Sequence, residues 1–305
     1  MTSSGITVTT DELIQLRSRS KVLTNKAKKH IHSSNAGGYL SSFKGRGMEF
    51  DEVRIYEQGD DIRHIDWRVT ARTGKTHSKL FREERERPIL LIVDQSQSMA
   101  FGTRVAFKSV IAAKAATLLA WAAIDKGDRV GALIFNDHQH TELRPTSGKK
   151  AVLRFIKTLT HYNPDIAHAP TIQPATSWVD TLAKAQRICK PGTLIFILSD
   201  FRSPDESAQK NLSLLRRHNS IVNIFIYDAL EETPPPAGIY PITNGIQRCH
   251  LDTGNKVTRQ RYTDQFRYRQ NFLDELKNKG VAKFFKLATH ENIEQTLSSG
   301  LAQAR

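Results

Sequence analysis

The stretch that decides the fold is Ile89-Leu-Leu-Ile-Val-Asp94-Gln-Ser96-Gln-Ser98-Met99. It opens with an unbroken apolar run, which is typical of a strand buried on both faces of a parallel sheet. The run ends at a carboxylate, and two hydroxyls follow at alternate positions. Because ligand sites of open α/β sheets lie just beyond the carboxyl ends of strands, we expect Asp94, Ser96 and Ser98 to converge on one point. Oxygen ligands of this kind suit a hard cation.

Further apolar runs and helical patterns alternate along the rest of the chain. Strands are expected at 129–135, 141–144, 193–198, 221–227 and 281–287, and helices at 10–29, 105–125, 149–159, 176–187, 204–218, 262–279 and 292–301. A hairpin is expected around 246–257, with its turn at Gly254. The alternation predicts an α/β fold with right-handed crossovers and a mainly parallel sheet flanked by helices.

Three segments follow one another in this scheme. Residues 1–38 are expected to form an N-terminal helical segment, residues 39–87 an extended region packed on the core, and residues 88–305 the α/β domain, with a hairpin insertion near 234–257. In the middle segment, charged and aromatic residues interleave without a clear period, and glycines indicate tight turns between short extended pieces. The chain therefore combines one large domain with a smaller and more irregular region.

The middle segment carries a dense set of charged residues beside aromatic ones, which is typical of a binding surface. The candidate partner-binding residues are Arg54, Asp60, Asp61, Arg63, Asp66, Trp67, Arg68 and Arg72. The alternative is that the three aspartates only neutralise Arg63, Arg68 and Arg72 in a salt-bridge network.

A second strand, at 193–198, also leads to an acid, Asp200, and Thr176 stands at the expected start of a helix. Two carboxylates and three hydroxyls fit octahedral Mg²⁺ better than a calcium cage or a zinc tetrahedron. With only two carboxylates, the ion would stay electrophilic and would accept an acidic side chain of a partner as a further ligand. Without a metal, Asp94, Thr176 and Asp200 would be ordinary helix caps.

Composition limits the other functions. The chain of 305 residues has 45 Lys and Arg against 31 Asp and Glu, a formal net charge of +14. This charge keeps open, as an alternative function, the binding of nucleic acid or of an anionic surface, although no nucleic-acid-binding motif accompanies it. Two cysteines without metal-site spacing, and no apolar run of spanning length, lead us to expect a cytoplasmic protein without an integral membrane segment, which meets a membrane only through a partner.

Two classes of enzyme fit the sequence poorly. An aspartyl-phosphate enzyme built on Asp94 needs a second acid two residues further on, and Ser96 stands there. A serine hydrolase needs a G-x-S-x-G elbow, and neither Ser96 nor Ser98 has flanking glycines. We therefore expect a protein that is not an enzyme.

Asp94-x-Ser96-x-Ser98, together with Thr176 and Asp200, resembles the metal-ion-dependent adhesion site of von Willebrand factor type A domains. The wider sequence resembles domain-of-unknown-function family 58 through four motifs, which are Gly47-Met-Glu-Phe50, Arg54-x-Tyr56-x-x-Gly59-Asp60-Asp-x-Arg63-x-Ile-Asp66-Trp67-Arg68, Ala71-Arg72-x-Gly74 and Leu198-Ser-Asp200-Phe201. The resemblance implies a Rossmann-like type A domain that binds Mg²⁺ or another divalent cation. It also implies an adaptor that works with a MoxR-type AAA+ ATPase in assembling or activating other protein complexes.

The second-loop threonine departs from the type A pattern in the residues that precede it. The family usually has two glycines before this threonine, whereas here Pro174 and Ala175 precede Thr176. Thr171 is therefore an alternative ligand.

Overall fold

The computed structural model describes residues 5–31, 48–83, 86–162, 178–202, 204–243 and 248–303. Contacts divide the chain into two compact units, which we call the α/β unit (residues 1–34 and 87–305) and the small unit (residues 35–86). The N-terminal helix, treated above as a segment of its own, thus belongs to the α/β unit.

The α/β unit is built on a six-stranded sheet with the order β10-β7-β6-β3-β4-β5. Its strands are β3 (Pro88–Asp94), β4 (Arg129–Phe135), β5 (His140–Thr146), β6 (Leu194–Ser199), β7 (Ser220–Tyr227) and β10 (Lys283–Ala288). Only β5 is antiparallel to its neighbour, whereas all the other pairs in the sheet are parallel. The mainly parallel, Rossmann-like α/β sheet expected from the sequence is therefore confirmed, with β3 at its centre.

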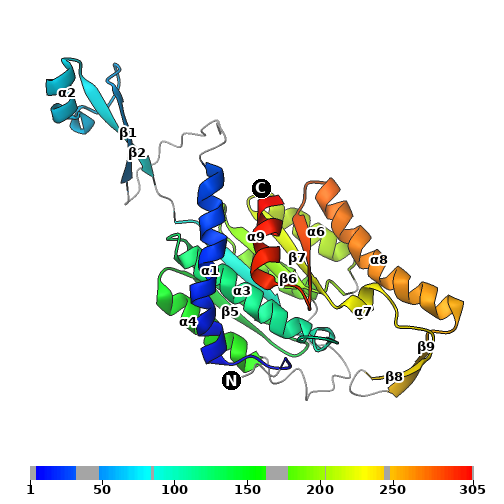
Figure 1. Ribbon diagram of the computed structural model, residues 1–305. Coiled ribbons are helices and arrows are strands. Elements are labelled where there is room, and N and C mark those ends of the chain that lie inside the picture. The colour runs from blue at the N-terminus through cyan, green and yellow to red at the C-terminus, as the bar shows by residue number, and fades with distance from the viewer. Residues whose placement is uncertain are drawn as a thin grey trace. The chain divides into compact units, whose positions relative to one another are not determined.

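Helices cover both faces of this sheet (Figure 1). The helices of the α/β unit are α1 (Thr10–Ile31), α3 (Lys108–Ile124), α4 (Lys149–Tyr162), α5 (Trp178–Ile188), α6 (Glu206–Arg216), α7 (Ala229–Glu232), α8 (Lys256–Asn278) and α9 (Ile293–Gln303), and a short 3-10 turn, η2 (Gln97–Met99), follows β3. Helix α3 packs on the sheet and is itself covered by α1, α4 and α9. This position explains why α3 is apolar nearly all round.

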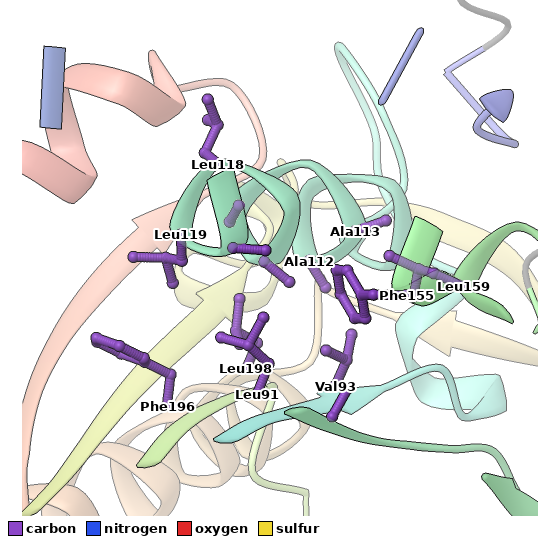
Figure 2. Close-up of a cluster of buried hydrophobic side chains, with 14 of the residues drawn as sticks. Leu91, Val93, Ala112, Ala113, Leu118, Leu119, Phe155, Leu159, Phe196 and Leu198 are labelled. Atoms are coloured by element: carbon purple, nitrogen blue, oxygen red, sulfur yellow. The ribbon is translucent and has the colours of Figure 1, made fainter. Parts of the chain in front are cut away.

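The alternation of side chains along β3 sends its apolar residues into two separate cores. Leu91 and Val93 belong to the core beneath α3, which Figure 2 shows with Phe155 and Leu159 of α4 beside it. Leu90 and Ile92 belong to the core on the opposite face, which also contains residues of α5, α6 and α8. Burial on both faces fixes the register of β3, and therefore fixes where the strand ends.

The small unit is a two-stranded antiparallel sheet of β1 (Met48–Ile55) and β2 (His77–Glu83), with a 3-10 turn, η1 (Ile62–His64), and a short helix, α2 (Trp67–Thr73), between them. The sequence analysis expected only extended pieces and turns here and missed α2. Asp66 caps this helix by accepting hydrogen bonds from the backbone N–H groups of Arg68 and Val69. Gly74 ends it in the left-handed conformation, at φ +70°, which glycine adopts at little cost.

The expected hairpin is present, but its turn is not at Gly254. Strand β8 (Ile239–Thr243) pairs with β9 (Arg248–Asp252), and Gly254 lies beyond the second strand. Asn255 then starts α8 by accepting hydrogen bonds from the N–H groups of Val257 and Thr258. The helix therefore begins at Lys256, whereas the sequence analysis expected a start at 262.

Candidate metal centre

The candidate site lies where two neighbouring strands end. Val93 of β3 and Leu198 of β6 are register partners in the parallel pair. The residues that follow, Asp94 on β3 and Asp200 directly after β6, therefore lie at the same edge of the sheet. Ser96 precedes η2, and Ser98 lies within it. These four residues of the predicted set come together, whereas Thr176 and its alternative Thr171 lie outside the described residues.

Both carboxylate oxygens of Asp94 accept hydrogen bonds, one from the loop after β3 and one from the end of β6. Its Oδ1 accepts from the backbone N–H of Ser96 at 2.9 Å, and its Oδ2 accepts from Ser199 Oγ at 2.6 Å. The hydroxyls of Ser96 and Ser98 lie 3.2 Å apart. Burial and the nearby charge of Asp200 raise the pKa of Asp94, although hydrogen bonds from Ser199 and Ser96 oppose this increase. The carboxyl is thus fixed in position, and a cation beside it would favour its ionised form.

Asp200 is paired with a buried cation. Its Oδ2 lies 2.7 Å from Lys108 Nζ, and both side chains are only 1% exposed. Its Oδ1 accepts from the backbone N–H of Arg202 at 3.2 Å. Burial alone would raise the pKa of Asp200, but the charge and hydrogen bond of Lys108, with smaller contributions from Arg269 and Ser98, lower it. Asp200 is therefore a carboxylate whose charge is already partly neutralised.

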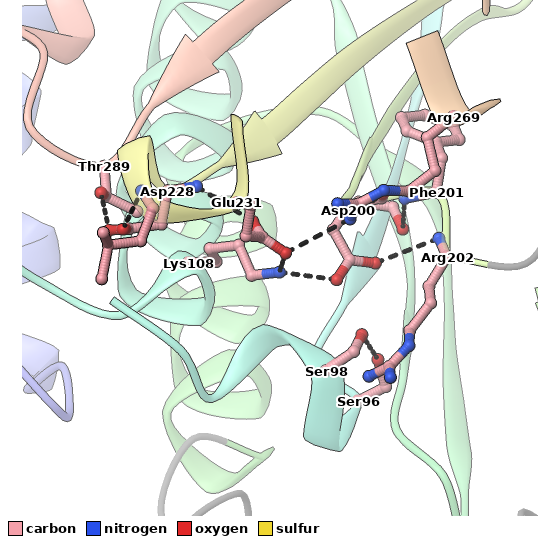
Figure 3. Close-up of polar contacts among 12 residues, drawn as sticks. Ser96, Ser98, Lys108, Asp200, Phe201, Arg202, Asp228, Glu231, Arg269 and Thr289 are labelled. Carbon is pink, nitrogen blue, oxygen red and sulfur yellow. Dashed lines mark hydrogen bonds and ion pairs between the residues drawn. The ribbon is translucent and has the colours of Figure 1, made fainter. Parts of the chain in front are cut away.

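Lys108 belongs to a larger ionic network that the sequence analysis missed (Figure 3). Its Nζ also lies 2.9 Å from Oε1 of Glu231, and Arg269 NH1 lies 3.3 Å from the same oxygen. Arg269 additionally donates to the backbone carbonyl of Asp200 at 3.4 Å. Two lysines, Lys108 and Lys114, inside the mainly apolar run 105–125 were the available signal, because a buried ammonium requires carboxylate partners.

The turn that carries the hydroxyls is fixed by groups that the sequence analysis also missed. Asp137, just beyond β4, accepts a hydrogen bond from the backbone N–H of Gln97. Gln95 is fully buried and donates to the backbone carbonyl of Ser109 at 3.2 Å. Ser199 accepts from the N–H of Phe201 while it donates to Asp94. The positions of Ser96 and Ser98 are thus determined by both neighbouring strands.

The chemistry of this donor set fits a divalent cation that prefers oxygen. Each carboxylate has about four lone-pair sites, so Asp94 and Asp200 keep acceptor capacity beyond the hydrogen bonds described above. Asp94, Ser96, Ser98 and Asp200 would hold the ion, with the threonine of the second loop as a further oxygen ligand. Among the described residues no group of three or more His, Cys, Asp or Glu side chains could hold a metal ion.

In the small unit, the three predicted aspartates have structural partners. Asp60 binds Arg54 at 2.6 Å, and Asp61 accepts from the backbone N–H of Arg63 and lies 3.3 Å from its guanidinium. Asp66 caps α2 and lies 3.6 Å from Lys79. Of the alternative salt-bridge network, the structure contains the pair of Asp61 with Arg63, whereas Asp66 lies near Lys79 and caps the helix instead of pairing with Arg68 or Arg72. Trp67, Arg68 and Arg72 are exposed, with Trp67 at 70%.

The fold and this cluster define an α/β protein with an oxygen-rich site at the carboxyl ends of its central strands. The chain belongs to the DUF58 family, because the family model described as "Protein of unknown function DUF58" matches residues 52–271. Similar proteins include the uncharacterized proteins Rv1480 of Mycobacterium tuberculosis and Mb1516 of Mycobacterium bovis, each 31% identical over 205 residues. These residues make up 66% of this chain and 62% of each relative, so the chain spans less than two thirds of their length.

Similar solved structures include BatB from Bacteroides thetaiotaomicron, at 13% identity and a TM-score of 0.44. This match covers 72% of the present chain and 98% of BatB. A von Willebrand factor type A protein from Catenulispora acidiphila is 11% identical, with a TM-score of 0.35, over 75% of this chain and 43% of that one. In the part of the chain that the structure describes, no helix combines the length and the apolar character needed to cross a membrane.

Proposed function

We propose that this protein is a non-catalytic adaptor that binds Mg²⁺ through Asp94, Ser96, Ser98, Asp200 and a threonine of the second loop, and binds a partner through that ion. The observation that carries the proposal is the convergence of four of these side chains on one hydrogen-bonded cluster at the ends of adjacent strands. Bound Mg²⁺ supplies an electrophilic position for an acidic side chain of the partner.

The residues of the chain would orient the ion rather than transfer protons. Asp200 stays ionised because Lys108 lowers its pKa, and a carboxylate with a lowered pKa is a poor general acid or base near neutral pH. Ser96 and Ser98 hydrogen-bond to each other and to the two carboxylates. The pKa of Asp94, which burial and Asp200 raise to about 6, would fall beside a bound cation, because the cation favours the ionised form. A site with fixed ligands therefore suits binding better than catalysis.

The partner class comes from the resemblance described above. Proteins of this kind are expected to work with a MoxR-type AAA+ ATPase and its client proteins in the assembly or activation of other complexes. We propose the small unit as a second contact surface, through the exposed Trp67, Arg68 and Arg72 of α2. Trp and Arg are enriched among the residues that contribute most of the binding energy at protein interfaces.

The test compares Asp94→Ala with Asp264→Ala, which removes an exposed carboxylate from α8. Titration of the purified chain with MgCl₂ in a calorimeter, in sodium acetate so that a carboxylate can complete the site, should show binding for the wild type and for Asp264→Ala, but none for Asp94→Ala. The wild type and Asp264→Ala should also pull down a MoxR-type ATPase, whereas Asp94→Ala should not. A chelator should abolish the pull-down. Equal binding by Asp94→Ala would refute the proposal. The same titration of Thr176→Ala and Thr171→Ala identifies the threonine ligand.

The alternative function is the binding of nucleic acid or of an anionic surface, and the cations on α2 favour it. Neither Arg68 nor Arg72 has an ion pair among the described residues. Affinity for phosphate groups would fall steeply with added salt. Binding that depends on salt and survives both chelator and Asp94→Ala would support this alternative over the adaptor.

A further inference from the structure

The most unusual group near the candidate metal centre is the ammonium of Lys108. It lies at the first position of α3, directly after Phe107, and its side chain is 1% exposed. The start of a helix carries a partial positive charge, which disfavours a lysine there. Burial disfavours the charge as well. Lys108 is therefore held at this position by its two carboxylate partners, Asp200 and Glu231, and not by the helix that carries it.

This ammonium changes the charge that an incoming ion would meet. Three carboxylates, Asp94, Asp200 and Glu231, are linked in the network, and two cations, Lys108 and Arg269, oppose them. With all five groups charged, the cluster has one net negative charge. A divalent ion bound there would keep a net positive charge, and a further carboxylate would neutralise it.

We propose that Lys108 keeps the intrinsic affinity of the site for Mg²⁺ low, so that stable binding of the ion requires an additional carboxylate from a partner. This inference rests on the proposed function and adds a regulatory property to it. The ion and the acidic partner would then bind cooperatively, because each supplies the charge that the other needs. Lys108 is a positioning and charge-setting residue, not a metal ligand.

Two variants with opposite expected effects test the proposal. Lys108→Met removes the ammonium while it keeps most of the apolar stem, and it should tighten Mg²⁺ binding at least about tenfold, which corresponds to about 1.4 kcal/mol. Glu231→Gln removes a carboxylate from the same network while it keeps the side-chain shape, and it should weaken binding. Lys114→Met is the matched control, because Lys114 lies on the same helix and pairs with Glu12 at 2.7 Å. It should leave the affinity unchanged.

The measurement is calorimetric titration of the full chain with MgCl₂, repeated in sodium acetate at the same ionic strength. Acetate should tighten binding to the wild type more than to Lys108→Met. Circular dichroism checks the fold, and Lys108→Gln replaces Lys108→Met if the methionine variant is unfolded. If neither Lys108 variant binds Mg²⁺ more tightly than the wild type does, the proposed role of Lys108 is overturned, whereas the proposed function still stands. Absence of Mg²⁺ binding to every variant would overturn both.

Discussion

Ser199 Oγ donates a hydrogen bond of 2.6 Å to Asp94 Oδ2 and so joins the ends of β6 and β3. The same oxygen accepts from the backbone N–H of Phe201 at 3.0 Å. Asp94 and Ser199 are 4% and 2% exposed, so water cannot easily replace either bond. One buried hydroxyl therefore links the two strand ends that carry the candidate metal ligands.

Ser199→Ala is expected to destabilise the α/β unit by about 1–3 kcal/mol, because a buried carboxylate oxygen and a buried N–H would both lose a partner. Urea unfolding followed by circular dichroism measures the change. Ser213→Ala is the control, since that hydroxyl donates to the carbonyl of Gln209 on an exposed part of α6, and its effect should stay within about 0.5 kcal/mol. Equal effects of the two substitutions would show that the link to Asp94 contributes nothing.

Phe201 has a left-handed backbone conformation, at φ +47°, immediately after Asp200. Phe201→Gly would relieve roughly 1–2 kcal/mol of backbone strain. It would also remove a ring that is 1% exposed and packs edge-on against Phe225, with ring centroids 6.3 Å apart. Because loss of a buried ring costs about 3–5 kcal/mol, packing should outweigh strain, and the variant should be less stable by roughly 2 kcal/mol. A glycine variant more stable than Phe201→Leu in urea unfolding would contradict this balance.

The sequence predicted the central strands and the meeting of Asp94 with Asp200 because both depend on local patterns. Apolar runs mark β3 and β6, and parallel neighbours place their carboxyl ends at one edge. Lys108, Glu231 and Arg269 could not be predicted in this way. They come from α3, α7 and α8, and their proximity depends on how the helices pack across the sheet.

Local signals were also weak in the segments that were assigned incorrectly. Strand β8 contains Pro241, which is uncommon inside strands, so this strand could not be placed from its own residues. The hairpin was therefore placed on β9 and the residues that follow it, instead of on β8 and β9. The start of α8 was missed because Asn255 acts as a cap before a polar stretch, where no apolar period marks the helix.

Asp228 joins three segments of the α/β unit through hydrogen bonds to Thr103, Leu230 and Thr289. Burial alone would raise its pKa, but these hydrogen bonds outweigh burial and hold the pKa below its ordinary value of 3.8. An acid with a lowered folded-state pKa contributes stability above the unfolded-state pKa and loses it as the pH falls through the folded-state value.

Asp228→Asn should therefore reduce stability near neutral pH, and its difference from the wild type should shrink as the pH falls below the ordinary value of 3.8. Urea unfolding at a series of pH values measures this difference. Asp264→Asn, on the exposed face of α8, provides the comparison. A difference between wild type and Asp228→Asn that stays constant from neutral to acidic pH would exclude the ionised carboxylate as its source.

Gly300 lies within α9, where alanine would ordinarily stabilise the helix by roughly 0.5–1 kcal/mol. Here an added Cβ would lie 2.4 Å from Cγ of Phe285 on β10, whose ring is also buried. Overpacking of this kind costs about 1–3 kcal/mol, so Gly300→Ala should destabilise the protein. Ser299→Ala, at the exposed neighbouring position, should not.

A double-mutant cycle with Phe285→Ala separates the contact from the helix propensity. In the Phe285→Ala background Cγ and the ring are both gone, so Gly300→Ala should become neutral or stabilising, as its helix propensity alone predicts. The free energy of unfolding of all four proteins in urea gives the coupling between the two positions. If Gly300→Ala lowers the free energy of unfolding by the same amount in both backgrounds, the contact with Phe285 does not explain why glycine is needed at this position.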